Sequence, residues 1–234
     1  MMAQEVRAIV QEVIKRTHNV KSIRLEPAGD LNFKAGQFLS VRLKAEKELK
    51  RYLSFSSSPS EGFIEFTKKL TESDFSRTLD GLKSKDEVFI QYPFGDFTLK
   101  DDHKKVAFLS GGIGITPIRS ICKFATDKKL DVDIALLYAN RTFSDIAFRQ
   151  DFDLMKKENP RLKVVHVLSE ACPDFESCMG RIDSGLIKKE VPDYSGRKFF
   201  LCGPPAMVDA MKKILSEELV LPKDSIITEN FQGY

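Results

Sequence analysis

The stretch FLSGGIGITP, residues 108–117, decides the fold of this chain. An apolar run ends there in a glycine-rich turn, and the next residues, TPIRSICKFATDKK, carry apolar side chains at helical spacing. A strand that turns into a helix in this way is typical of an open α/β sheet, which binds ligands at the carboxyl ends of its strands. The glycines let the backbone approach a ligand closely, and the start of the helix favours an anion.

This turn fits neither of the common phosphate-binding patterns. A P-loop needs Gly-Lys-Ser/Thr, and the turn contains no lysine. The dinucleotide fingerprint fits only as Gly112, Gly114 and Pro117, with a proline that suits the first turn of a helix. A second turn, CGPP from Cys202 to Pro205, follows another apolar run. Two such turns in one sheet indicate a nucleotide site more specifically than either does alone.

The periodicity of the chain changes near residue 101. Before it, short β-rich runs such as VKSIRLEP, GQFLSVRLK and GFIEFTKKL are separated by turn residues, which favours an antiparallel barrel or sandwich. After it, apolar runs alternate with helical segments, which indicates βαβ units and a parallel sheet. We therefore expect a β-barrel domain over residues 1–101 and a doubly wound α/β domain over residues 102–234.

Composition excludes several classes of protein. The net charge of the 234 residues is +3, and basic and acidic residues are interleaved, so we expect no nucleic-acid partner. No run reaches the roughly 18 uncharged residues of a membrane span, and the charged start lacks a signal-peptide core, so we expect a cytoplasmic protein without a membrane span. The four cysteines include no C-x-x-C pair and the three histidines form no local motif, so no metal site is expected.

With both turns in place, the sequence resembles the ferredoxin–NADP reductase family of flavoproteins across essentially its whole length. The nucleotide domain of that family opens with G-G-x-G-x-T-P and later carries C-G-P-P. The resemblance implies that these turns receive NAD(P) and that the first hundred residues form a flavin-binding barrel. The nucleotide-binding residues it implies are Gly111, Gly112, Gly114, Ile115, Thr116, Pro117, Gly203 and Pro204.

The flavin motif of the family, R-x-Y-[ST], corresponds to Arg51-Tyr52-Leu53-Ser54. The resemblance implies that Arg51 pairs with a flavin phosphate and that Ser54 bonds the flavin ring near its reactive nitrogen. Leu53 departs from the family, which usually has an aromatic residue there. Tyr52 should point to the other face of the strand unless a bulge shifts the register.

Two more hydroxyl residues are expected at the flavin. Ser76, in SDFSRTL, fits a family position at the start of a helix that donates to the flavin phosphates; its alternative role is a plain helix cap. Thr67, on the run GFIEFTKKL, is also assigned to cofactor binding.

The end of the chain resembles the Glu-x-Tyr ending of plant-type members. The resemblance implies that Glu229 lies beside the nicotinamide and that Phe231 covers the flavin, a role for which Tyr234 competes. Together with Ser54 and Cys202, which leads the second turn, Glu229 completes the expected catalytic set.

The resemblance implies the function of a flavin-dependent NAD(P)H reductase. Electrons would pass from the nicotinamide through FAD, favoured over FMN, to a separate carrier such as ferredoxin, flavodoxin or an oxygenase component. Members of the family that prefer NADPH hold an arginine at the position of Glu170, so we expect a preference for NADH. Arg141 is the counter-argument, because it could reach a 2′-phosphate from the end of the neighbouring strand. The alternatives are a free flavin or quinone reductase and a non-catalytic, nucleotide-binding redox sensor.

Overall fold

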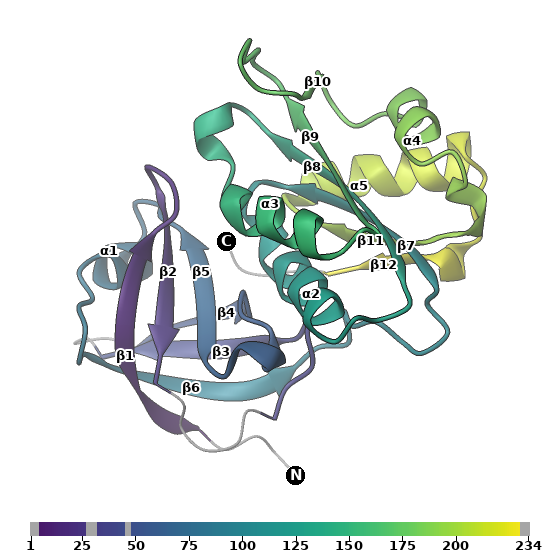
Figure 1. Ribbon diagram of the computed structural model, residues 1–234. Helices are drawn as coiled ribbons and strands as arrows, with labels where there is room; N and C mark the ends of the chain where they lie inside the picture. The colour runs from purple at the N-terminus through teal and green to yellow at the C-terminus, as the bar shows by residue number, and fades with distance from the viewer. Residues whose placement is uncertain (1–4, 27–31, 45–47, 230–234) are drawn as a thin grey trace.

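The structure is a computed structural model that describes residues 5–26, 32–44 and 48–229 (Figure 1). The chain folds into two units that lie against each other, each built around its own sheet. The first unit is antiparallel, and its strands run in the order β4-β3-β6-β1-β2-β5. Its strands are β1 (Val6–Lys15), β2 (Val20–Leu25), β3 (Phe38–Leu43), β4 (Leu49–Ser54), β5 (Ile64–Lys69) and β6 (Glu87–Phe94).

The first sheet curls until its two edge strands meet. Just beyond β4, Phe55 forms a bridge with Phe66 of β5, and the Ser56 amide donates to the Glu65 carbonyl at 2.7 Å. The resulting barrel is filled from alternate positions along its strands, as the two-residue period of a strand requires. Helix α1 (Asp74–Asp80) covers one end of the barrel, and Ser73 caps its first turn. The predicted barrel is confirmed.

The second sheet is parallel and has the strand order β10-β9-β8-β7-β11-β12. Neighbouring positions on β7 face opposite sides: Val106 and Phe108 pack in one hydrophobic core, and Ala107 and Leu109 in another. Helices cover both faces of this sheet, which is the doubly wound arrangement expected from the sequence (Figure 1). Its strands are β7 (Lys105–Gly111), β8 (Asp133–Asn140), β9 (Leu162–Leu168), β10 (Cys178–Met179), β11 (Lys198–Cys202) and β12 (Ile226–Thr228).

The helices divide between the two faces of the parallel sheet. Residues of α2 (Ile115–Asp127) and α3 (Arg149–Glu158) belong to the core that contains Phe108, whereas those of α4 (Ser184–Glu190) and α5 (Pro205–Lys213) belong to the other. No helix within the described ranges has the length and apolar character needed to span a bilayer.

The order of the parallel strands positions the site. Strand β7 lies between β8 and β11, so the connections that leave β7 and β11 depart toward opposite sides of the sheet. A crevice opens at the carboxyl ends of strands where the order reverses in this way, and open α/β sheets bind ligands there. Both glycine turns of the sequence, GGIGITP after β7 and CGPP after β11, lie at this point.

Candidate active site

A cavity of about 500 Å³ lies between the barrel and the parallel sheet. It brings the R-Y-L-S motif of β4 opposite both glycine turns, although these segments are far apart in the sequence. Its barrel side is lined by Arg51, Tyr52, Leu53, Ser54, Thr67, Lys68, Lys69 and Thr71. Its other side is lined by Gly112, Ile113, Gly114, Thr116, Pro204 and Pro205.

The first glycine turn is shaped by close backbone contacts. Gly112 has a left-handed φ of +52°, and a Cβ added to it would meet open space. A Cβ on Gly114 would lie 2.3 Å from the carbonyl oxygen of Cys202, so only glycine lets the two turns touch. The hydroxyl of Tyr138 donates to the Gly112 carbonyl at 3.1 Å, which pins the turn to β8. The turn therefore presents backbone, rather than side chains, to the cavity.

Cationic side chains surround the barrel side of the cavity. Arg51, Lys68 and Lys69 all line it. Burial lowers the pKa of Lys68, and the nearby charge of Arg51 lowers it further. An anion in the cavity would relieve this repulsion, which fits a ligand that carries phosphate. Lys68 and Lys69 were not predicted from the sequence; the signal available was the TKK run on a strand that neighbours the arginine motif.

The Ser54 hydroxyl is buried and has no hydrogen-bond partner among the described residues. The Thr67 hydroxyl, by contrast, lies 2.7 Å from that of Ser22 and donates to that of Ser56 at 2.8 Å. A buried polar group without a partner is costly, so Ser54 is the hydroxyl that a ligand in this cavity would satisfy.

Tyr52 and Leu53 lie on opposite sides of β4, since β3 and β4 pair without a bulge. The Tyr52 ring is 49% exposed and makes edge-to-face contacts with Phe38 and Phe94 at 5.8 and 6.0 Å between centroids. Leu53 packs against the barrel core. The regular register therefore gives the alternation expected from the sequence.

Ser76 is not among the residues that line the cavity. It is buried in the first turn of α1, where its hydroxyl lies 3.1 Å from that of Thr71 and accepts from that of Ser73 at 3.2 Å. Thr71 does line the cavity, so the hydroxyl cluster borders the site through Thr71.

Cys202 and Glu229 lie together behind the second turn. The Cys202 thiol is buried, and its pKa is raised well above the ordinary value by burial and then by the charge of Glu229. Burial raises the pKa of Glu229 to about 7, with a further contribution from Asp96. One carboxylate oxygen of Glu229 has no hydrogen-bond partner among the described residues. Phe231 and Tyr234 lie outside the described residues.

The two residues expected to select the nucleotide are partners of each other. Arg141 follows β8 and Glu170 follows β9, and the Arg141 guanidinium donates to the Glu170 carboxylate at 2.7 Å. The Glu170 amide also donates to the Arg141 carbonyl at 2.9 Å. The ion pair is exposed at the carboxyl edge of the sheet, outside the residues that line the cavity.

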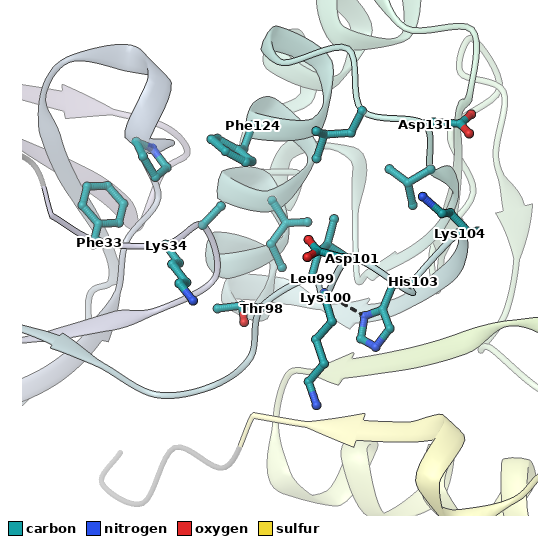
Figure 2. A pocket seen from close by; sticks show the side chains of 15 residues that line it. Phe33, Lys34, Thr98, Leu99, Lys100, Asp101, His103, Lys104, Phe124 and Asp131 are labelled. Atoms are coloured by element: carbon teal, nitrogen blue, oxygen red, sulfur yellow. Dashed lines mark hydrogen bonds between the residues drawn. The ribbon is translucent and has the colours of Figure 1, made fainter.

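A larger cavity of about 710 Å³ lies elsewhere along the junction of the two units (Figure 2). Phe33 and Lys34 of the barrel face Phe124 of α2 across it, and His103 and Asp131 line its far side. None of the motif residues borders it, so the smaller cavity is the candidate active site. Nowhere in the described part of the chain do three or more His, Cys, Asp or Glu side chains gather as metal ligands would.

Comparisons with known proteins agree with this geometry. Residues 7–99 match the family described as oxidoreductase FAD-binding domain, and residues 108–213 match the one described as oxidoreductase NAD-binding domain. The chain is 30% identical over 238 residues to the reductase component of propane 2-monooxygenase from Mycolicibacterium goodii, covering 97% of this chain and 68% of that protein.

It is also 34% identical over 194 residues to NADH-cytochrome b5 reductase 1 from Lodderomyces elongisporus, covering 80% of this chain and 65% of that protein. The chain thus spans about two thirds of the length of both relatives. Its fold superposes on that of a ferredoxin NADP+ reductase from Neisseria gonorrhoeae, crystallised with FAD and NADP, with a TM-score of 0.82 over 97% of this chain and 99% of that one at 19% identity. This chain is therefore a member of the ferredoxin–NADP reductase-like family of FAD- and NAD(P)-dependent oxidoreductases.

Proposed function

We propose that this protein takes hydride from NADH onto FAD bound in the 500 Å³ cavity and passes the electrons to a separate carrier protein. The observation that carries the proposal is the cavity itself, which the flavin motif of β4 and both nucleotide turns line together. Residues 1–101 would hold the flavin and residues 102–234 the nucleotide. Relatives include reductase components of monooxygenases, so the expected carrier is a ferredoxin, a flavodoxin or an oxygenase component.

The barrel side of the cavity suits a flavin. Arg51 and Lys68 supply the positive charge for the phosphates, and the unpartnered Ser54 hydroxyl supplies a hydrogen bond for the ring. Leu53 offers an apolar side chain to the ring in place of the usual aromatic one. When bound, the flavin supplies the redox chemistry by accepting a hydride and releasing electrons singly. The task of the protein is therefore to bind and orient the flavin and the nicotinamide, and to exclude water.

The opposite side suits a nicotinamide nucleotide. The turn from Gly112 to Thr116 exposes backbone at a helix start for the pyrophosphate, and the Cys-Gly-Pro-Pro turn lies against it for the nicotinamide end. Cys202 remains a neutral thiol because of its burial, so it acts by contact rather than as a nucleophile. Glu229, with a pKa of about 7, holds or releases a proton near neutral pH. Phe231 would cover the flavin.

The ion pair at the edge of the sheet supports a preference for NADH. Glu170 pairs with Arg141, so a guanidinium that could bind the 2′-phosphate of NADPH already has a carboxylate partner. The Glu170 carboxylate would repel that phosphate but can accept hydrogen bonds from the free ribose hydroxyls of NADH.

The purified protein tests the proposal directly. It should be yellow, release FAD on heating, and lose its flavin absorbance when NADH is added without oxygen. A steady-state screen with ferredoxin, flavodoxin, cytochrome, free flavin and quinone would then identify the class of acceptor. A colourless protein that cannot be loaded with flavin, or a flavin that neither nucleotide bleaches, would contradict the proposal. A cytoplasmic location stays a prediction that cell fractionation would test.

A further inference from the structure

Arg119 makes the most extensive polar contacts across the junction of the two units. It lies on α2, one turn after Thr116, and its side chain is 7% exposed. Its guanidinium donates to both oxygens of Glu61, at 2.9 Å for Oε1, and to Oδ1 of Asp151 at 2.7 Å. It also donates to the Ser56 carbonyl at 3.1 Å. Glu61 and Ser56 belong to the barrel, so one side chain of the nucleotide unit holds the flavin unit at two points.

These contacts belong to a larger, partly buried network of charge. Asp151 lies 3.6 Å from the guanidinium of Arg16, which in turn bonds both oxygens of Glu65 at 3.1 Å. Arg24 reaches the same carboxylate at 3.1 Å. Three cations and three carboxylates alternate along the chain Glu61, Arg119, Asp151, Arg16, Glu65 and Arg24, and their side chains are 1% to 25% exposed. Removal of Arg119 would leave the largely buried Glu61 carboxylate without its ion-pair partner.

The network is attached to the segments that form the active site. Ser56 follows Ser54 by two residues, and Glu65 precedes Thr67 by two residues on β5. On α2, Ser120 beside Arg119 donates to the Ser57 carbonyl at 2.6 Å. The flavin side of the cavity is thus tied, through two neighbouring residues, to the helix that begins at the nucleotide turn.

Packing supports the same junction only in part. Val20, Ala35 and Phe97 of the barrel half join the hydrophobic core that contains α2. Beside them, between Phe33 and Phe124, lies the 710 Å³ cavity, so side chains do not fill the junction there (Figure 2). Polar contacts, which are directional, therefore carry much of the alignment that close packing would otherwise provide.

We infer that Arg119 is a positioning residue for the reaction: it sets the spacing between the flavin half of the active site and the nucleotide half. It does not line the cavity and touches neither expected ligand. This spacing affects the rate because the reacting atoms in hydride transfer must lie about 3–3.5 Å apart, and a misplacement of 1 Å can slow the reaction about a hundredfold. The inference rests on the proposed function.

The test compares Arg119→Met with Arg119→Lys and with a matched control, Arg197→Met. Arg197 is an equally buried arginine that bonds Asp193 at 2.7 Å and the Val106 carbonyl at 3.1 Å, all within the nucleotide unit. Flavin reduction by saturating NADH, followed by stopped flow, should slow about ten- to a hundredfold in Arg119→Met, with flavin affinity within about twofold of the parent. The rate of flavin reduction in Arg119→Lys should lie between the rates in Arg119→Met and in the parent. In Arg197→Met, the flavin should be reduced at the parent rate.

Calorimetry without added nucleotide gives an independent result. The parent and Arg197→Met should each unfold in one transition, whereas Arg119→Met should show two, because the coupling between its units is much weaker. If Arg119→Met does not fold, Glu61→Gln keeps the shape of the contact and should give the same pattern more weakly.

Three results would overturn the inference: a parent-like reduction rate in folded Arg119→Met, an equal loss of rate in Arg197→Met, or a single unfolding transition in all variants. A parent protein that binds no flavin would instead overturn the proposed function, and calorimetry would still decide whether Arg119 couples the units.

Discussion

Replacement of Ser54 by alanine should change stability in opposite directions with and without flavin. The Ser54 hydroxyl is buried and has no partner among the described residues. An unpartnered buried polar group costs about 1–3 kcal/mol, so we expect Ser54→Ala to stabilise the flavin-free protein by about 1 kcal/mol or more. In a chain of this size each kcal/mol raises Tm by about 2–4 °C. With flavin bound, the same change removes a hydrogen bond of about 0.5–1.5 kcal/mol and should weaken flavin binding about two- to tenfold.

Thermal unfolding of flavin-stripped and flavin-saturated protein, followed by circular dichroism, measures both effects. Ser56→Ala is the matched control, because the Ser56 hydroxyl donates to Glu65 at 2.9 Å and accepts from Thr67 at 2.8 Å. It should destabilise both forms. A flavin-free Ser54→Ala protein that melts below its parent would refute the reasoning, since the hydroxyl would then be satisfied before any flavin binds.

Four further changes test the remaining roles. The pKa of Glu229 in the folded protein, about 7, lies above its ordinary value of 4.5, so the folded form binds the proton more tightly and loses stability as pH rises from about 4.5 to 7. Glu229→Gln should remove that part of the loss, and urea midpoints at pH 5 and pH 8 that shift equally in both proteins would argue against it. Glu170→Arg should move the preference toward NADPH, as measured by the kcat/KM ratio of the two nucleotides; a parent that favours NADPH tenfold would contradict the assignment. Arg51→Ala should lose a charge-assisted contact of about 1.5–3 kcal/mol and weaken flavin binding about ten- to a hundredfold, as measured by flavin retention after dilution and gel filtration. Cys202→Ala should slow flavin reduction by nicotinamide while leaving flavin bound, and a parent rate in stopped flow would leave Cys202 as a core residue only.

Local patterns predict much of this architecture because each reports on a short stretch of chain. The strand, turn and helix around Gly112 and the cap at Ser73 depend on residues within a few positions of each other. The Arg119 contacts are not visible in this way, because Glu61 and Asp151 lie 58 and 32 positions away. From the sequence alone, an arginine on a helix is expected to lie on the surface, and only the fold shows which residues cover it.

The same limit explains two details of the site. Glu170 and Arg141 look like competing determinants in the sequence, yet parallel strands bring their ends together as an ion pair. The sequence pattern at Ser76 predicts a helix start but not that Thr71, whose hydroxyl contacts that of Ser76, lines the cavity while Ser76 does not. Side-chain direction at an element's end depends on tertiary contacts that spacing alone does not report.

The contact between Gly114 and Cys202 has a consequence for how the nucleotide site forms during folding. The turn at Gly114 is complete in the chain as soon as α2 follows it, but its facing wall is the backbone of Cys202 and Gly203, which emerges about 90 residues later. A nascent or truncated chain that ends before β11 therefore carries the glycine turn without the surface against which it closes. Nucleotide can therefore stabilise only those chains in which β11 has paired with β7. The stabilisation that added nucleotide gives thus measures whether this late strand pairing has taken place.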